Sequence, residues 1–136
     1  MNVREIMTPE PYAVSVTSSV RHVLRMLAEA DVRHLPVVDE GLLVGIVSDR
    51  DLRSFGAMGP DALEQPELAR RALAQPVSEV MSSDVVTVNP ESDVAEVIDL
   101  MIEHRIGAVP VVEPGSKQLV GIVSYVDALR AARDLV

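Results

Sequence analysis

The chain of 136 residues contains no cysteine and no tryptophan, and its only aromatic residues are two tyrosines and one phenylalanine. Without cysteine the chain cannot form a disulfide framework, a zinc ribbon or a thiol nucleophile, and this composition fits a reducing compartment. Without an aromatic stacking platform, a planar ligand would have to pack between aliphatic side chains. The absences therefore exclude several classes of site and leave an aliphatic, non-metal site open.

Basic side chains and long apolar runs are also scarce. The chain has 12 lysines and arginines against 21 aspartates and glutamates, which gives a net charge of −9. Nucleic-acid surfaces need many cations to displace counter-ions, so we predict no nucleic-acid partner. Apolar runs such as Leu42 to Val47 are far too short to span a bilayer, and no leader-like apolar core follows the N-terminus. We therefore predict a cytoplasmic protein without membrane association.

The acidic charge is distributed unevenly. Residues 1–53 hold 6 basic and 8 acidic side chains (net −2), whereas residues 54–136 hold 6 and 13 (net −7). An anionic ligand would therefore be repelled less by the first part of the chain.

What the sequence does contain is one pattern written twice. Residues 20–38 return as residues 94–112 at a constant shift of 74, and three short stretches recur: REIM as SEVM, HLPVVD as AVPVVE, and LVGIVSDRD as LVGIVSYVD. Neither copy alone is expected to bury its apolar face, so the two should pack together as one module. We assign residues 1–55 to the first repeat, 56–76 to a connector and 77–136 to the second repeat.

Within each copy the apolar periodicity predicts the order strand, helix, strand, strand, helix. Ser18 and Ser92 stand just before the first helix of each copy and are predicted to cap it. In the connector, Pro60 is expected to start a helix that Pro66 breaks or restarts, and we expect this segment only to span the distance between the repeats. The expected strands are 13–16, 35–38 and 42–47 in the first copy and 85–88, 109–112 and 119–123 in the second.

Two related motifs end the last strand of each copy, GIVSDRDL at residues 45–52 and GIVSYVDAL at residues 121–129. Each follows an apolar-Pro-Val-Val strand, and together with the β-α-β-β-α order they resemble the CBS domain; two copies resemble a stand-alone tandem CBS pair. The resemblance covers the chain except residues 54–75. It implies an α/β (α+β) fold of two pseudo-symmetric βαββα repeats packed sheet to sheet. It also implies a homodimeric regulatory module whose cleft between the repeats binds an adenosine-containing ligand such as AMP, ADP, ATP or S-adenosylmethionine.

The motifs also have a physical interpretation of their own. Ser48 with Asp51, and Ser124 with Asp127, place a hydroxyl and a carboxylate at a strand-to-helix junction, where a carboxylate can accept both hydroxyls of a ribose. The same Ser-x-x-Asp spacing is equally typical of a helix capping box, so both interpretations stay open. Candidate aliphatic walls for an adenine are Val14, Leu35, Ile46, Val86, Val109 and Ile122.

The cations near these motifs differ between the copies. Arg50 lies inside the first motif, where the second has Val126, so we predict that the two sites are not equivalent. The stretch HRIGAVP at residues 104–110 is similar to one that contacts phosphates in adenylate-sensing CBS proteins, whereas a solvated helix C-terminus would also explain its two cations. The predicted ligand-binding residues are Val14, Arg33, His34, Leu35, Ser48, Arg50 and Asp51 in the first copy and Val86, His104, Arg105, Ala108, Val109, Ser124, Tyr125 and Asp127 in the second.

Catalytic interpretations have little support in the sequence. The three histidines lack metal-ligand spacing, and no phosphate loop or Gly-x-Ser-x-Gly motif is present. We predict no enzymatic activity, no metal and no required cofactor, with AMP, ADP or ATP as the regulatory ligand and an unknown protein as the target. The alternatives are an S-adenosylmethionine or NAD sensor and a dimeric scaffold with vestigial clefts. Surplus apolar residues predict dimerisation: Met26, Leu27, Leu52, Phe55, Leu100, Met101, Ile102, Leu129, Leu135 and Val136.

Overall fold

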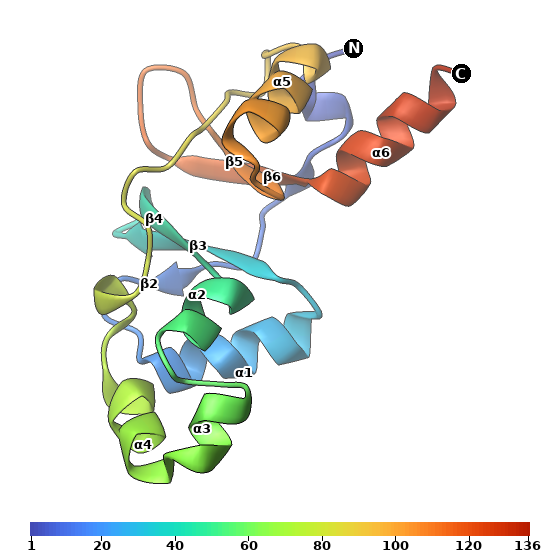
Figure 1. The fold of residues 1–136 in the computed structure, drawn as a ribbon. Coiled ribbons are helices and arrows are strands. Elements are labelled where there is room, and N and C mark those ends of the chain that lie inside the picture. The colour runs from blue at the N-terminus through green and yellow to red at the C-terminus, as the bar shows by residue number, and fades with distance from the viewer. The chain divides into compact units, whose positions relative to one another are not determined.

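The computed structural model describes residues 1–136, which form two compact units. The central unit comprises residues 12–40 and 44–84, and the C-terminal unit comprises residues 1–11, 41–43 and 85–136. Each unit contains a three-stranded sheet (Figure 1). Each unit contains segments of both copies of the repeat, so the units do not test the predicted repeat boundaries, which stay a prediction.

The central unit confirms the predicted β-α-β-β-α order of the first copy. Its sheet has the strand order β2-β3-β4, and β2 runs parallel to β3. Buried side chains of α1 and the strands, among them Val23, Leu35 and Val47, form its core. The elements are β2 (Val14–Ser15), α1 (Val20–Ala30), β3 (His34–Asp39), β4 (Leu42–Ser48), α2 (Asp49–Ser54), α3 (Pro60–Glu64), α4 (Pro66–Ala74) and the 3-10 helix η2 (Val77–Glu79).

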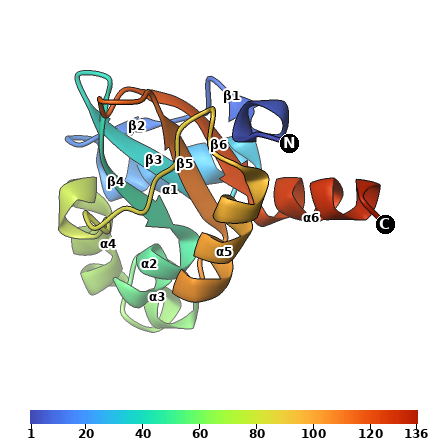
Figure 2. The same cartoon turned by 90° about the horizontal axis from the view of Figure 1, so that it is seen from above.

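The C-terminal unit has the strand order β1-β6-β5, with both pairings antiparallel (Figure 2). The predicted strand at residues 85–88 is reduced to one bridge between Val88 and Val111. In the first copy Val16 extends the equivalent pairing by donating its N–H to Val38 O, but the matching residue is Pro90, which has no N–H. The elements are η1 (Val3–Glu5), β1 (Thr8–Pro9), α5 (Val94–His104), β5 (Ala108–Val112), β6 (Leu119–Ser124) and α6 (Tyr125–Asp134).

The predicted caps of the first helices are wrong by one residue. Ser19 caps α1 by accepting a hydrogen bond from His22 N at 3.1 Å, and Asp93 caps α5 by accepting one from Ala95 N at 2.9 Å. Ser92 instead closes the preceding turn, where its Oγ accepts from Asn89 N at 3.1 Å. Where two residues that can cap a helix are adjacent, as in Ser18-Ser19 and Ser92-Asp93, the sequence does not show which of them is the N-cap.

The first residues of each copy pair with the last strand of the other copy. In the C-terminal unit β1 pairs with β6, Thr8 opposite Ile122. In the central unit Ser82 pairs with Ile46 through two backbone hydrogen bonds of 2.9 Å. The short REIM and SEVM repeats, at residues 4–7 and 78–81, therefore lead directly into the residues that pair at the edges of the two sheets.

The motif glycines make this pairing possible. A Cβ at Gly45 would lie 2.5 Å from Met81 Sδ and 2.9 Å from Ser82 O, and one at Gly121 would lie 2.6 Å from Met7 Sδ. A real Cβ essentially never approaches another atom so closely, so a side chain at either position would force the neighbouring methionine to shift, and at Gly45 also the backbone of Ser82. The glycines of the two motifs are thus explained by packing, and no ligand is needed to account for them.

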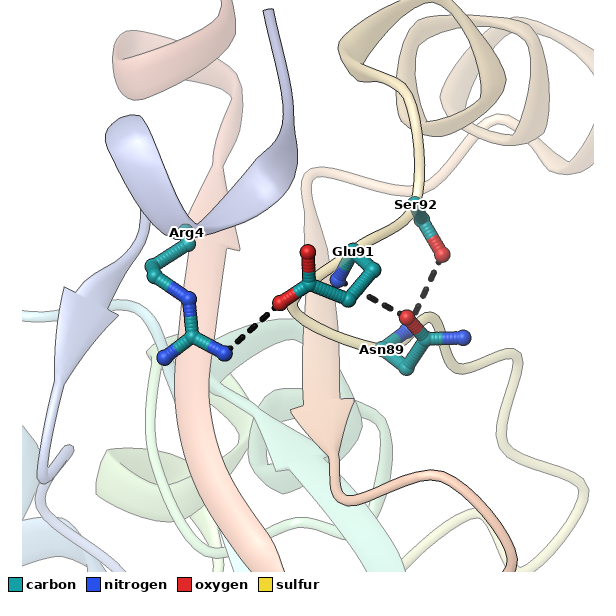
Figure 3. A network of polar contacts seen from close by, with 4 residues as sticks. All are labelled: Arg4, Asn89, Glu91 and Ser92. Carbon is teal, nitrogen blue, oxygen red and sulfur yellow. Dashed lines mark hydrogen bonds and ion pairs between the residues drawn. The ribbon is translucent and has the colours of Figure 1, made fainter.

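A polar network fastens the N-terminal segment within the C-terminal unit (Figure 3). Arg4 Nη2 lies 2.8 Å from Glu91 Oε1, and Glu91 N donates to Asn89 Oδ1 at 2.8 Å. Backbone bonds from Val3 N to Ser92 O and from Arg4 N to Pro90 O, at 2.8 and 3.0 Å, add to it. This network fixes η1 against the loop that leads into α5.

The connector is packed more closely than the sequence led us to expect. Pro60 and Pro66 occupy the first turns of α3 and α4, as predicted, because their missing N–H groups are unpaired there in any case. Ala69 and Ala72 of α4 are buried, and Ala72 belongs to the core of the central unit. The connector therefore contributes to a core and does not merely span between repeats. No helix of the chain combines the length and apolar character that crossing a membrane requires.

Candidate functional site

The two strand-to-helix junctions carry the same hydrogen-bonded frame. At the first junction, where β4 meets α2, Asp51 N donates to Ser48 Oγ at 3.1 Å and Ser48 N donates to Asp51 Oδ2 at 2.9 Å. At the second junction, where β6 meets α6, the equivalent bonds between Ser124 and Asp127 are 3.3 and 2.9 Å long. Both Ser-x-x-Asp motifs therefore form capping boxes, as one of the two interpretations of the sequence predicted.

The capping role leaves part of each carboxylate free. Asp51 and Asp127 use Oδ2 for the cap, and their Oδ1 atoms make no hydrogen bond within the chain. Both side chains are half-buried. A carboxylate of this kind can hold its helix start through one oxygen and accept a ligand hydroxyl through the other. Capping and ribose binding are thus compatible roles for the same residue.

The first junction carries an ion pair that the sequence analysis missed. Arg33 Nη1 lies 3.2 Å from Asp49 Oδ2, and Asp49 N donates to Arg33 O at 3.1 Å. The Arg33 side chain is 74% exposed and that of Asp49 is 30% exposed. Arg50 is also exposed, so two arginines lie beside the capping box formed by Ser48.

His34 begins β3 next to this ion pair and is half-buried. Burial lowers its pKa from the ordinary value of 6.5, because the charged imidazolium loses hydration, and the charge of Arg33 lowers it further. The carboxylates of Asp49 and Asp51 act in the opposite direction without overcoming the burial effect. His34 is therefore neutral at pH 7 and adds no cation to the first junction.

The second junction has the same backbone hydrogen bond as the first but different side chains. Tyr125 N donates to Gly107 O at 2.9 Å, the counterpart of the bond from Asp49 N to Arg33 O. Neither Gly107 nor Tyr125 can form an ion pair, and Val126 takes the place of Arg50. The prediction that the two sites are not equivalent for a ligand stays a prediction.

The cations predicted for the second copy lie at the end of a helix. His104 is the last residue of α5, and Arg105 follows it in the left-handed conformation with φ of 54°. Both are exposed. Asp31 ends α1 in the same conformation, with φ of 52°, so this helix ending is common to both copies. The location matches the helix C-terminus interpretation, and any contact of these side chains with phosphate stays a prediction.

The predicted apolar residues fall into two groups. Val14, Leu35, Ala108 and Val109 are buried in the structure. Ile46, Val86 and Ile122 are half-buried and keep accessible surface. Contact of either group with a planar ligand stays a prediction. No group of three or more histidine, aspartate or glutamate side chains is placed to hold a metal ion.

The Arg33–Asp49 pair had a signal in the sequence that the repeat analysis did not use. The shift between the copies is 74 up to the hairpin and 76 after it, because the second hairpin turn is longer. These two shifts map Arg33 onto Gly107 and Asp49 onto Tyr125. Aligning the residues before and after the hairpin turn separately would have shown that these two positions carry opposite charges in the first copy and no charge in the second.

Comparisons with known proteins agree with the duplicated pattern. The sequence profile of the CBS domain matches residues 3–57 and 77–134. The CBS domain-containing protein YhcV of Bacillus subtilis is 32% identical over 127 residues, which are 93% of this chain and 81% of that protein. The structure of CBSX2, a CBS-pair protein of Arabidopsis thaliana, in complex with AMP is 29% identical with a TM-score of 0.81, over 98% of this chain and 97% of the other.

A third similar structure contains different ligands. The CBS domain pair of protein MJ0100, in complex with 5′-methylthioadenosine and S-adenosyl-L-methionine, is 28% identical with a TM-score of 0.79, over 100% of this chain and 98% of the other. The relatives with enzyme names are longer proteins, of which this chain spans between 15% and 22%. Those matches concern one portion of each enzyme.

Proposed function

The chain belongs to the CBS domain family, and from that membership we propose that it is a cytoplasmic, non-catalytic regulatory module that binds an adenine nucleotide. AMP, ADP or ATP is the proposed ligand, and the two strand-to-helix junctions are the proposed recognition sites. Ligand occupancy would act on a protein target by favouring one conformation of the module, which requires that the ligand bind that conformation more tightly.

One observation carries this proposal: each junction holds an aspartate whose Oδ2 is fixed by the capping box and whose Oδ1 is free. The cap orients the carboxylate before a ligand arrives, so little conformational entropy is lost on binding. A ribose presents two adjacent hydroxyls that such a carboxylate can accept. The complex of CBSX2 with AMP supports an adenosine ligand for a related protein.

The charges favour a nucleotide over S-adenosylmethionine. Arg33 and Arg50 at the first junction and Arg105 near the second are cations that suit phosphate, which arginine binds through several N–H donors. S-adenosylmethionine carries a positive sulfonium, an ammonium and only one carboxylate, so it offers these arginines less negative charge than a phosphate does. It remains a competing ligand to be tested because the related MJ0100 domain pair binds it.

A dimeric scaffold is the second candidate function. Ile102 of α5 and Leu129 of α6 are 71% and 63% exposed, and Leu135 is exposed beyond them. Most of the other apolar residues named for dimerisation are buried or half-buried, for example Leu27, Leu52 and Met101. We propose a homodimer whose contact includes Ile102 and Leu129, because exposed apolar side chains on neighbouring helices favour a twofold interface.

Light scattering tests the assembly. Leu129→Asp should give a monomer, because a charge placed in an apolar interface is left unpaired. Leu63→Asp is the matched control, since Leu63 is 86% exposed on α3 and lies outside the proposed interface. A wild-type monomer at micromolar concentration, or dissociation by both variants, would contradict the proposed dimer.

Thermal denaturation with a panel of AMP, ADP, ATP, NAD and S-adenosylmethionine tests the ligand class. A ligand present at 100 times its dissociation constant should stabilise the fold by about 2.7 kcal/mol. We expect the nucleotides to stabilise most, with affinities by calorimetry that fall as salt is added. Stabilisation by S-adenosylmethionine alone would replace the nucleotide with that ligand, and no stabilisation by any compound would favour the scaffold.

A further inference from the structure

The charge of Arg33 is already engaged in the structure, but only weakly. A guanidinium has five N–H donors, and the contact of Arg33 Nη1 with Asp49 Oδ2 at 3.2 Å is the single side-chain hydrogen bond that Arg33 makes. The side chain is 74% exposed, so it can leave Asp49 without disturbing the core. Exposed ion pairs of this kind are readily exchanged for another anion.

The ion pair is not needed to build the first junction. The backbone bond from Asp49 N to Arg33 O has a counterpart at the second junction, from Tyr125 N to Gly107 O, where no ion pair is possible. The capping boxes are also present at both junctions. The Arg33–Asp49 pair is therefore an addition at the first junction, and its removal leaves the hydrogen-bonded frame intact.

We propose that Asp49 is an internal counter-ion that competes with the ligand phosphate for Arg33 and so sets the selectivity of the first junction. This inference rests on the proposed function, because it concerns the tail of the same ligand. A phosphate can accept several guanidinium donors and carries more negative charge than one carboxylate, so it displaces Asp49. Asp49 thereby lowers the affinity for a phosphate-bearing ligand and leaves the affinity for a neutral nucleoside unchanged.

The surroundings of Arg33 make this competition consequential. His34, the neighbouring candidate cation, is half-buried and has its pKa lowered by burial, so at neutral pH it adds no charge to those of Arg33 and Arg50. Asp51 is committed to the capping box through Oδ2. Among the residues that contact Arg33 or the capping box, Asp49 is thus the side chain that can be exchanged for a ligand anion.

Calorimetric titration of the full chain with AMP and with adenosine tests the inference. Asp49→Asn should bind AMP about fivefold more tightly, the upper end of what an exposed ion pair contributes, with unchanged affinity for adenosine. Arg33→Gln should weaken AMP binding, and adding Asp49→Asn to it should give no gain. Asp99→Asn is the charge control, since Asp99 is an exposed carboxylate of α5. It should alter neither affinity.

The outcomes separate this inference from the proposed function. Wild-type protein that binds neither AMP nor adenosine would overturn both. Wild-type binding of both compounds, with AMP affinity unchanged or weakened in Asp49→Asn, would overturn only the role of Asp49. An equal gain in the Arg33→Gln background or in Asp99→Asn would overturn it too, because the effect would then be general electrostatics. If Asp49→Asn melts at a lower temperature, Asp49→Ser provides the second variant for the same measurement.

Discussion

The two junctions differ in their charges and agree in their hydrogen bonds. Both junctions have the Ser–Asp capping box and a backbone hydrogen bond from the first helical residue to the carbonyl of Arg33 or Gly107. Both also have a glycine in the last strand that makes room for the pairing segment from the other copy. Arg33, Asp49 and Arg50 of the first junction become Gly107, Tyr125 and Val126 in the second. The shared features are those that folding requires, so the differences between the junctions are where ligand discrimination is to be sought.

The largest expected effect comes from breaking the shared packing. Gly45→Ala should destabilise the fold by about 1 to 3 kcal/mol, because its Cβ would meet Ser82 O at 2.9 Å as well as Met81 Sδ. Gly121→Ala should cost less, since the nearest backbone oxygen, Thr8 O, lies 3.1 Å away and Met7 can move. Urea denaturation measures both.

A double variant serves as the control for this packing argument. Met81→Ala removes the flexible side chain next to Gly45 but leaves Ser82 O in place, so Gly45→Ala should cost less stability in the Met81→Ala background than in the wild type, with part of the cost remaining. Complete rescue would mean that the backbone approach imposes no constraint. Equal stability losses at the two glycines would contradict the predicted order.

The caps provide the next test of the comparison. Ser124→Ala should cost about 1 kcal/mol of unfolding free energy, and Ser48→Ala should cost somewhat less. The reason is that Ser124 Oγ also donates to Asp127 Oδ2 at 3.0 Å, a bond without a counterpart at Ser48. Ser124→Thr retains the hydroxyl and should remain close to wild type. A larger loss for Ser48→Ala would show that the extra bond does not contribute.

The smallest expected effect is a pH dependence confined to the first junction. The pKa of His34 is lower in the folded protein than its ordinary value of 6.5, so the unfolded chain binds a proton more readily. Its contribution to stability is therefore complete above pH 6.5 and is lost as the pH falls below that value. His34→Gln should reduce the loss of stability as the pH falls below 6.5. His104→Gln, at an exposed position, is the control, and an equal reduction there would contradict the assignment.

The repeat architecture could be predicted because the apolar periodicity is strong in both copies. Strands β3 to β6 and helices α1 and α5 lie where runs such as 35–38 and 94–101 place them. The missing strand at 85–88 could not be predicted from apolar residues alone, since in the first copy the equivalent pairing is extended by the N–H of Val16, and Pro90 at the matching position has none. Local patterns show which residues prefer a strand and not which strand partners they find.

The capping boxes of the candidate site could be predicted from the sequence, whereas its strand pairing and its ion pair could not. The Ser-x-x-Asp spacing indicated both a cap and a ligand carboxylate, and the structure shows the cap. The pairing of each copy's first residues with the other copy's last strand was hidden, because neither Thr8 nor Ser82 carries a signal of the strand with which it pairs. The Arg33–Asp49 pair joins residues 16 positions apart and depends on the hairpin that brings them together.

Calorimetric titration of AMP into Asp51→Asn and Asp127→Asn tests the central claim, that the capping aspartates also bind ligand and do so unequally. Asparagine can still accept the bond from Ser48 N or Ser124 N, so the melting temperatures should barely change. We predict that Asp51→Asn weakens AMP binding at least about tenfold, because a charge-assisted hydrogen bond is lost, and that Asp127→Asn weakens it less. Unchanged AMP binding in both variants would reduce the aspartates to helix caps, and equal losses would contradict the inequality of the two junctions.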